Sequence, residues 1–275
     1  MLADLDRPAV EPGRIHGARM DVSIILLDPV PASVPGWHGL PALPWQPLTG
    51  HAVHVDSIPG TPPVSIAVFR VNPGRVIEAA FASLATDERG RAATFHRPCD
   101  RDRYCIAHAA LRSMLAERLG IGADQVEFGK GARGKPTLRQ PPADIQFNLS
   151  YSDGVVAIAV STRSVGIDVE AFRRDLDVEG IAMRFFTDDE QAYLREAPPG
   201  ARLERFLDVW TRKEAAVKAS GIGVVGLASA CVIGEYIRLP DERGNDVRYR
   251  TRALPMKSVL PRHALAIAYR SGRYG

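Results

Sequence analysis

The sequence IQFNLSYSDGVVAIAVSTRSVGIDVE, residues 145–170, decides the fold. Short runs rich in β-branched residues alternate in it with turn residues. It therefore predicts a turn at Ser152–Gly154 and strands at Ile145–Leu149, Val155–Val160 and Gly166–Val169. Because these strands cluster instead of alternating with helices, the expected fold class is α+β, and a parallel βαβ array is disfavoured.

Helices and further strands are predicted on both sides of this stretch. Before it come a strand at Val64–Val71 and a helix over Asp102–Leu119, whose apolar residues recur at helical spacing. After it we expect helices at Val178–Phe186, Asp188–Glu196 and Leu203–Ala219, and strands near Ala230–Tyr236, Asp246–Ala253 and Ala264–Tyr269. The second part loosely repeats the plan of the first. We therefore expect two similar α/β halves, residues 61–161 and 162–275, packed against each other.

Residues 1–60 are predicted to form a Pro-rich N-terminal extension. Eleven of the 21 prolines fall within the first 63 residues, and proline fixes φ and removes a hydrogen-bond donor. We therefore expect an irregular segment with one strand, Asp21–Leu27. Trp37 and Trp45 favour docking of this segment on the rest of the protein, and a partly disordered leader is the alternative.

Composition limits the classes of function. The 275 residues are 45% apolar and 24% charged, and the formal net charge is +3. These values are typical of a soluble globular protein and disfavour a nucleic-acid binder that relies on bulk positive charge. Three cysteines without C-x-x-C spacing argue against disulfides or a zinc site and predict a cytoplasmic location. No apolar run approaches the ~20 residues of a membrane span, and we expect no signal peptide.

Two carboxylates within Gly166–Glu170 are candidate ligands of a metal ion. Residues i and i+2 of a strand share a face, so Asp168 and Glu170 are expected to point the same way. Two carboxylates at that spacing repel each other unless a cation lies between them. Hard oxygen ligands of this kind suit Mg²⁺, which can bind phosphate at the same time. From the spacing alone, a solvated strand edge is the alternative.

Two basic segments are candidates for phosphate binding. Lys130–Pro136 is a glycine-rich loop, and Trp210–Lys218 predicts a helix with Trp210, Glu214 and Lys218 on one stripe. Only five of the 35 basic residues are lysines, and four of the five lie in these segments, namely Lys130, Lys135, Lys213 and Lys218. Lysine and arginine are not equivalent as phosphate ligands, so this placement indicates a phosphate site. The alternatives are a surface turn and an ordinary i,i+4 ion pair.

Four segments, taken in order, resemble the motifs of the Sfp-like (surfactin-synthetase-activating type) 4′-phosphopantetheinyl transferases. The family pattern is G-K-P, F-N-[IL]-S-H-[ST], G-[IV]-D-[IV]-E and W-[ST]-x-K-E-A-x-x-K. This chain has Gly134–Pro136, Phe147–Ser152, Gly166–Glu170 and Trp210–Lys218. By itself, Phe147–Ser152 is typical of a strand that ends in an Asx- or Ser-type turn. Arg184–Phe186 with Glu190 resembles the family's R-F-F-x-x-x-E segment, and the resemblance spans roughly residues 62–270.

This resemblance implies a fold and a reaction. Members of the family consist of two similar α+β halves related by a pseudo-twofold, with coenzyme A in the cleft between them. They transfer the 4′-phosphopantetheine arm of coenzyme A to a serine hydroxyl of an apo acyl or peptidyl carrier protein, and they release 3′,5′-ADP. Coenzyme A and carrier proteins are therefore the expected partners. We expect a monomer that binds neither nucleic acid nor membranes.

The resemblance also assigns roles to residues. It implies that Asp168, Glu170 and Glu214 hold Mg²⁺ and that Glu214, Lys218 and Asp168 carry the catalysis, with either Glu214 or a metal-bound water as the base. The residues implied in coenzyme binding are Arg91, Arg103, Gly134, Lys135, Pro136, Ser150, Tyr151 and Lys213. Tyr151 replaces the family's His, which contacts a coenzyme phosphate. Since tyrosine carries no positive charge, we expect weaker coenzyme binding.

Two other functions would use the same residues. A Mg²⁺-dependent phosphodiesterase or nuclease needs these carboxylates and lysines together with a groove of positive charge. A coenzyme A-binding regulator with an inert site is disfavoured, because a regulator has little use for all three carboxylates. The sequence leaves the pathway open: polyketide, nonribosomal peptide, fatty acid and siderophore carriers are all candidates.

Overall fold

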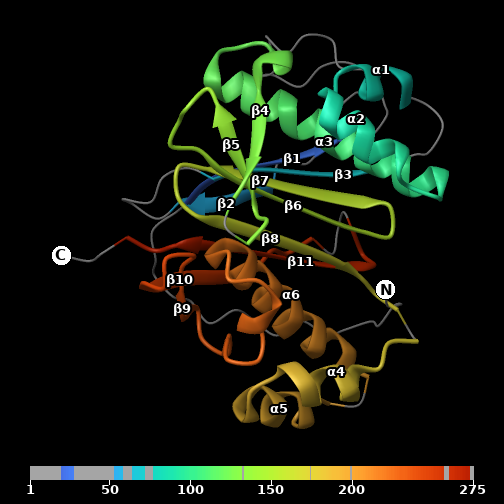
Figure 1. Ribbon diagram of the computed structural model, residues 1–275. Coiled ribbons are helices and arrows are strands. Elements are labelled where there is room, and N and C mark those ends of the chain that lie inside the picture. Colours follow the sequence, from blue (N-terminus) through green and yellow to red (C-terminus); the bar gives the residue numbers. More distant parts are fainter. Residues whose placement is uncertain are drawn as a thin grey trace.

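Two β-sheets pack face to face between two groups of helices in the computed structural model (Figure 1). The structure describes residues 20–27, 53–57, 64–71, 77–131, 133–173, 175–198, 200–256 and 260–272. One sheet has the strand order β2-β1-β3-β7-β6 and the other β8-β11-β10-β9, while β4 (Glu127–Lys130) and β5 (Pro136–Gln140) form a separate hairpin. This mixture of helices and sheets confirms the predicted α+β fold class.

The five-stranded sheet carries its helices on one face (Figure 1). Its strands are β1 (Met20–Leu27), β2 (Val53–Ser57), β3 (Val64–Arg70), β6 (Gln146–Ser152) and β7 (Val155–Ser161), and its helices are α1 (Ile77–Ala82), α2 (Thr86–Ala93) and α3 (Pro98–Leu119). All neighbouring strands pair antiparallel except β1 and β3, which run parallel. Every residue of β7 is buried, because one face of the strand packs under α3 and the other meets the second sheet.

The four-stranded sheet is antiparallel throughout. It consists of β8 (Val165–Ala171), β9 (Tyr236–Pro240), β10 (Asp246–Ala253) and β11 (His263–Arg270), and its helices are α4 (Val178–Phe185), α5 (Asp188–Arg195) and α6 (Arg202–Ser220). Helix α6 covers the face that points away from the first sheet (Figure 1). Among the described helices, none is long and apolar enough to cross a membrane.

The close approach of α6 to β8 depends on Gly166. A Cβ atom built on Gly166 would lie 2.1 Å from the Ala215 carbonyl oxygen and 2.5 Å from the Ala219 backbone nitrogen. Since these are backbone atoms of α6, any side chain at position 166 would push the helix away from the strand. Glycine therefore lets the last turns of α6 lie directly on β8, two residues from Asp168.

We expect Gly166→Ala to lower the free energy of unfolding by about 1–3 kcal/mol, the cost of overpacking a core. Gly90 supplies a matched control, because it lies inside α2 and a Cβ there meets nothing within 4 Å. Gly90→Ala should be neutral or slightly stabilising, since alanine favours helix more than glycine does. Urea unfolding measures both variants, and equal stabilities would contradict the packing argument.

Most predicted elements are confirmed, and some regions differ. Helices α3 to α6, strands β3, β6, β7, β8, β10 and β11, and the strand predicted at Asp21–Leu27 all occur. The elements that were not predicted are β2, the short helices α1 and α2, and the β4–β5 hairpin. Trp37 and Trp45 lie outside the described residues. The strand predicted at Ala230–Tyr236 is wrong, since β9 begins only at Tyr236. The backbone before β9 is bonded to side chains of α5 and α6 instead. Glu190 accepts from the Val232 N–H at 2.9 Å, and Lys213 donates to the Ala230 carbonyl.

A buried histidine begins β11. Burial, reinforced by the charge of Arg70 and opposed by that of Asp153, lowers the pKa of His263 to about 4. An unfolded chain would bind this proton with a pKa of about 6.5. As the pH falls from about 6.5 towards 4, this histidine is protonated in the unfolded state but not in the folded state. The free energy of unfolding therefore decreases.

We expect this histidine alone to cost about 3 kcal/mol of stability across that pH range, at about 1.4 kcal/mol per pH unit. His263→Gln removes the titration and should flatten this part of the curve, whatever constant offset it introduces. The measurement is the free energy of unfolding in urea at several pH values from 7.5 to 4.5. Parallel curves for the two proteins would show that His263 titrates normally in the folded state.

Candidate active site

A buried carboxylate and a lysine form the centre of the site. Asp168 on β8 is only 2% exposed. Its Oδ1 atom accepts a hydrogen bond from Lys218 Nζ at 2.6 Å and another from Ser150 Oγ at 2.9 Å. Lys218 Nζ also donates to Ser150 Oγ at 3.1 Å. Asp168 Oδ2 is buried and has no hydrogen-bond partner in the part of the chain that the structure describes.

Two further carboxylates flank this pair. Glu170 follows Asp168 on the same side of β8, and its Oε2 atom accepts from Ser152 Oγ at 3.0 Å. Glu214 precedes Lys218 by one turn of α6, which lies against β8 because of Gly166. The structure therefore brings together the sequence-predicted residues Asp168, Glu170, Glu214, Lys218 and Ser150.

The electrostatics of the cluster follow from burial and from the excess of carboxylates. Burial raises the pKa of Asp168 to about 7; Lys218 opposes this shift, and Glu170 and Glu214 add to it. Burial also raises the pKa of Glu214. Burial alone would lower the pKa of Lys218, but the charges of Asp168, Glu214 and Glu170 raise it above its usual value. Lys218 therefore holds its proton, and three carboxylates face one ammonium group.

The cluster suits a divalent cation in its chemistry. Among the residues that the structure describes, no three His, Cys, Asp or Glu side chains are gathered into a ready metal site, so the predicted ligand triad is not preassembled. However, the charges of Glu170 and Glu214 add to the raised pKa of Asp168, and its buried Oδ2 atom has no hydrogen-bond partner among the described residues. Carboxylate oxygens are the ligands that Mg²⁺ prefers, and a cation would relieve their repulsion.

A ladder of side chains connects the two sheets beside this cluster. Asn148 Oδ1, Ser150 Oγ and Ser152 Oγ on β6 accept hydrogen bonds from backbone N–H groups of β8. The donors are Ile167, Val169 and Ala171, at 2.8, 3.3 and 3.1 Å. The expectation of a turn at the end of Phe147–Ser152 is therefore wrong, because the whole segment lies within β6 and its polar side chains join the two sheets.

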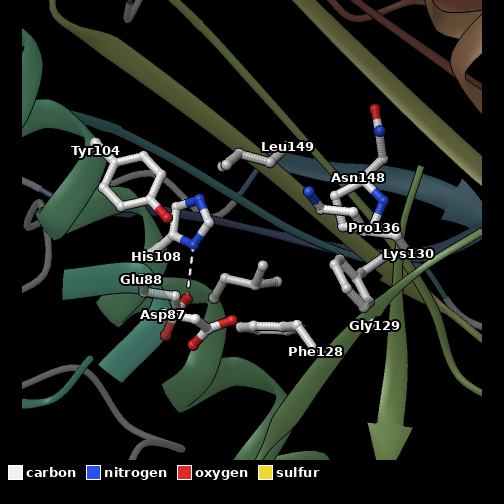
Figure 2. A pocket seen from close by; sticks show the side chains of 12 residues that line it. Asp87, Glu88, Tyr104, His108, Phe128, Gly129, Lys130, Pro136, Asn148 and Leu149 are labelled. Carbon is white, nitrogen blue, oxygen red and sulfur yellow. Dashed lines mark hydrogen bonds and ion pairs between the residues drawn. The ribbon is translucent and has the colours of Figure 1, made fainter. Parts of the chain in front are cut away.

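A cavity of about 290 Å³ opens between α2, α3 and strands β4, β5 and β6 (Figure 2). The rings of Tyr104 and His108 lie 4.0 Å apart between centroids. His108 Nδ1 lies 2.7 Å from Glu88 Oε1, and Arg112 donates to the other carboxylate oxygen at 2.6 Å. The remaining walls are largely apolar: Leu111, Phe128, Pro136, Phe147 and Leu149. Asn148 lines the cavity as well, so the cavity reaches the ladder.

The other predicted coenzyme ligands are spread around these two places. Pro136 lines the cavity, and the guanidinium of Arg103 lies over the ring of Tyr151, 5.8 Å from its centroid. Arg91 is exposed on α2, and Gly134 occupies a turn with φ of 82°. Lys135 reaches α6 and β8, where its Nζ donates to the carbonyls of Ala219 at 3.1 Å and Val165 at 3.4 Å. Burial lowers the pKa of Lys135 to about 8.

The structure does not bring Lys213 to the site, which corrects the prediction that it binds the coenzyme. Lys213 is fully buried, and its Nζ lies 2.5 Å from Glu190 Oε2, which is equally buried. Glu190 also accepts from the backbone N–H groups of Thr187 and Val232. A side chain that is enclosed and paired in this way cannot reach a phosphate. Sequence reasoning missed this pairing, and its signal was the R-F-F-x-x-x-E segment that contains Glu190.

Comparisons with known proteins agree in the activity that they name. The profile described as "4'-phosphopantetheinyl transferase superfamily" matches residues 164–266, and that described as "4'-phosphopantetheinyl transferase, N-terminal" matches residues 74–163. The chain is 37% identical to the 4′-phosphopantetheinyl transferase HetI of Nostoc sp. over 191 residues, which are 68% of this chain and 76% of the relative. It is 33% identical to the transferase psf-1 of Bacillus pumilus (58% of this chain, 67% of the relative). It is 26% identical to the transferase Sfp of Bacillus subtilis (54% of this chain, 64% of the relative).

Proposed function

The chain belongs to the 4′-phosphopantetheinyl transferase superfamily, and from this membership we propose how it carries out its reaction. It is an enzyme that transfers phosphopantetheine to carrier proteins. We propose that coenzyme A is the donor, that a carrier serine hydroxyl is the acceptor, and that 3′,5′-ADP is released. The observation that supports this assignment best is the Lys218–Asp168–Ser150 cluster, in which residues from three of the four motifs meet.

In the proposed reaction, the serine oxygen of the carrier bonds to the phosphorus that bears the pantetheine arm. The bond from that phosphorus to the bridging oxygen breaks, and its electron pair leaves with 3′,5′-ADP. Glu214 is the carboxylate that we propose accepts the serine proton, since its raised pKa suits a general base. Lys218 keeps its proton and is placed to steady the developing negative charge.

Mg²⁺ is the cofactor that the donor set would take. Asp168, Glu170 and Glu214 would hold it, and when bound it would neutralise charge on the pyrophosphate and on the leaving oxygen. The unpartnered Asp168 Oδ2 supports this proposal, because a buried carboxylate oxygen ordinarily has a partner.

We propose that coenzyme A lies along the boundary between the two halves, with its base in the cavity of Figure 2. The neighbouring rings of Tyr104 and His108 and the apolar walls suit a flat aromatic ring. Pro136 lines the cavity, Ser150 belongs to the cluster, and Arg103 on α3 contacts Tyr151 on β6. We propose that all four residues contact the nucleotide. Arg91, Gly134 and Lys135 complete the proposed set.

The proposal extends to the organisation of the chain. Residues 61–161 and 162–275 would be halves related by a pseudo-twofold, since each pairs strands of one sheet with one long helix, α3 or α6. Residues 1–60 would be the Pro-rich extension, which adds β1 and β2 to the first sheet. We propose a cytoplasmic monomer, which accords with the three free cysteines, Cys99, Cys105 and Cys231.

Mass spectrometry of carrier proteins tests the function. The protein is incubated with coenzyme A, Mg²⁺ and a panel of apo acyl and peptidyl carriers, and each carrier is weighed with and without chelator. We expect a gain of one phosphopantetheine mass that chelator abolishes. No gain on any carrier in a buffer where another transferase works would refute the assignment. Release of nucleotides from DNA or RNA would instead favour a phosphodiesterase.

Tyr151→His should lower the KM for coenzyme A by about 3–10-fold, because a charged hydrogen-bond donor gains more from a phosphate than a phenol does. The gain should be larger at pH 6 than at pH 8, where histidine is neutral. Tyr151→Phe, which removes only the hydroxyl, is the matched control and should raise the KM modestly. An unchanged KM in the histidine variant would show that position 151 does not contact a coenzyme phosphate.

A further inference from the structure

We propose that Ser152, together with Ser150, is a positioning residue that sets how the carboxylates of β8 face a metal ion. The inference rests on the proposed function, which assigns Asp168 and Glu170 to that ion. It concerns the two serines of the ladder, whose hydroxyl groups each contact both a backbone N–H group and a carboxylate of β8.

The ladder has a regular geometry. β6 and β8 are edge strands of two different sheets, and the three acceptors on β6 occupy alternate positions. Each acceptor pairs with an N–H group 19 residues further along the chain. The side chains therefore follow β8 in register, so the strand that carries both carboxylates is fixed relative to the first half at three successive points.

Ser150 and Ser152 differ from Asn148 because they also donate hydrogen bonds to the carboxylates. A hydroxyl accepts with its lone pairs and donates with its proton. Ser150 accepts from Val169 N–H and donates to Asp168, while Ser152 accepts from Ala171 N–H and donates to Glu170. Asn148 accepts from the Ile167 N–H, and in the described part of the chain it makes no hydrogen bond to either carboxylate. Asn148 therefore fixes only the register of β6 against β8. The two serines fix this register and also orient the carboxylates of Asp168 and Glu170.

These contacts restrict the carboxylates before any ion binds. With Ser150 and Lys218 on Oδ1, the Oδ2 atom of Asp168 is the oxygen left for a cation. Ser152 donates a hydrogen bond to Oε2 of Glu170. Hydrogen bonds that orient metal ligands are typically worth 10–100-fold in metal affinity or activity. A glutamate without this contact must lose more rotamer freedom when it binds the ion.

The test compares Ser152→Ala with Ser152→Thr and Asn148→Ala. Mg²⁺ is titrated calorimetrically into each protein saturated with coenzyme A, and the Mg²⁺ dependence of transfer to a carrier is measured separately. We expect Ser152→Ala to raise the Mg²⁺ Kd and the half-saturating Mg²⁺ concentration by about 10-fold, with the KM for coenzyme A changed by less than about 2-fold. Ser152→Thr keeps the hydroxyl and should restore wild-type values.

Asn148→Ala separates positioning from simple structural support. It removes the hydrogen bond from the Ile167 N–H, so we expect a loss of stability similar to that of Ser152→Ala. Its Mg²⁺ Kd should stay at the wild-type value. Equal Mg²⁺ affinities for Ser152→Ala and wild type would overturn the inference about Ser152 but not the proposed transferase function. So would an Asn148→Ala protein whose Mg²⁺ affinity falls as far as that of Ser152→Ala. Failure of the wild-type protein to modify any carrier would overturn the proposed function itself.

Discussion

Asp168→Ala is expected to slow transfer to carrier proteins by about 10³-fold or more, a loss of about 4 kcal/mol of transition-state stabilisation. The variant removes the carboxylate that contacts both Lys218 and Ser150 and that offers the unpartnered oxygen to a cation. The measurement is the rate of carrier mass gain at saturating coenzyme A and Mg²⁺. Calorimetric titration with Mg²⁺ should show weaker binding in the same variant.

The fold should survive this change. Burial raises the pKa of Asp168 to about 7, which means that the folded environment disfavours the ionised side chain. Its removal therefore should not lower the melting temperature by more than a few degrees. Asp189→Ala, which removes an exposed carboxylate from the first turn of α5, is the control and should keep full activity. Full activity in Asp168→Ala would refute the assignment of this residue to the metal and to catalysis.

Glu190→Gln is expected to destabilise the protein by about 3–5 kcal/mol, because it leaves the Lys213 ammonium buried without a counter-charge. Both side chains of the pair are fully enclosed, and Glu190 also holds the backbone around Val232. A loss of this size is a large part of the 5–15 kcal/mol that stabilises a typical domain. Urea unfolding measures it directly.

The matched variant removes both charges. Glu190→Gln with Lys213→Met keeps an amide oxygen for the Val232 N–H and has no buried ammonium, so we expect it to recover most of the lost stability. Its KM for coenzyme A should equal that of the wild type, since Lys213 lies away from the site. A double variant that is stable but binds coenzyme A several-fold more weakly would show that Lys213 contacts the coenzyme after all.

The difference between Lys213 and Lys218 shows where sequence reasoning reached its limit. Helical spacing places Trp210, Glu214 and Lys218 on one stripe, and the structure puts Glu214 and Lys218 beside the same carboxylate. Lys213 precedes Glu214 by one residue, which turns it about 100° around the helix. That rotation directs it into the core, where only the fold supplies Glu190 from α5. The residue type of Lys213 indicated a phosphate ligand, but its side chain points into the core and so cannot bind a phosphate at the site.

The carboxylates of β8 were predictable for a simple reason, and their serine partners were not. Strand alternation alone puts Asp168 and Glu170 on one side. Ser150 and Ser152 become their partners only because the two sheets pack with their edge strands β6 and β8 side by side, which no local pattern reveals. The missed start of β9 has the same origin: residues 230–235 look like a strand, but distant side chains bind their backbone.

The side-chain ladder also bears on how this protein avoids aggregation. β6 and β8 end their respective sheets, and an open strand edge is a template on which a foreign chain can add a strand. In β8 the outward N–H groups of Ile167, Val169 and Ala171 are already bonded to β6 side chains. An incoming strand would find these donors occupied. The contacts that orient the carboxylates thus also close an edge that would otherwise be open to amyloid-like pairing.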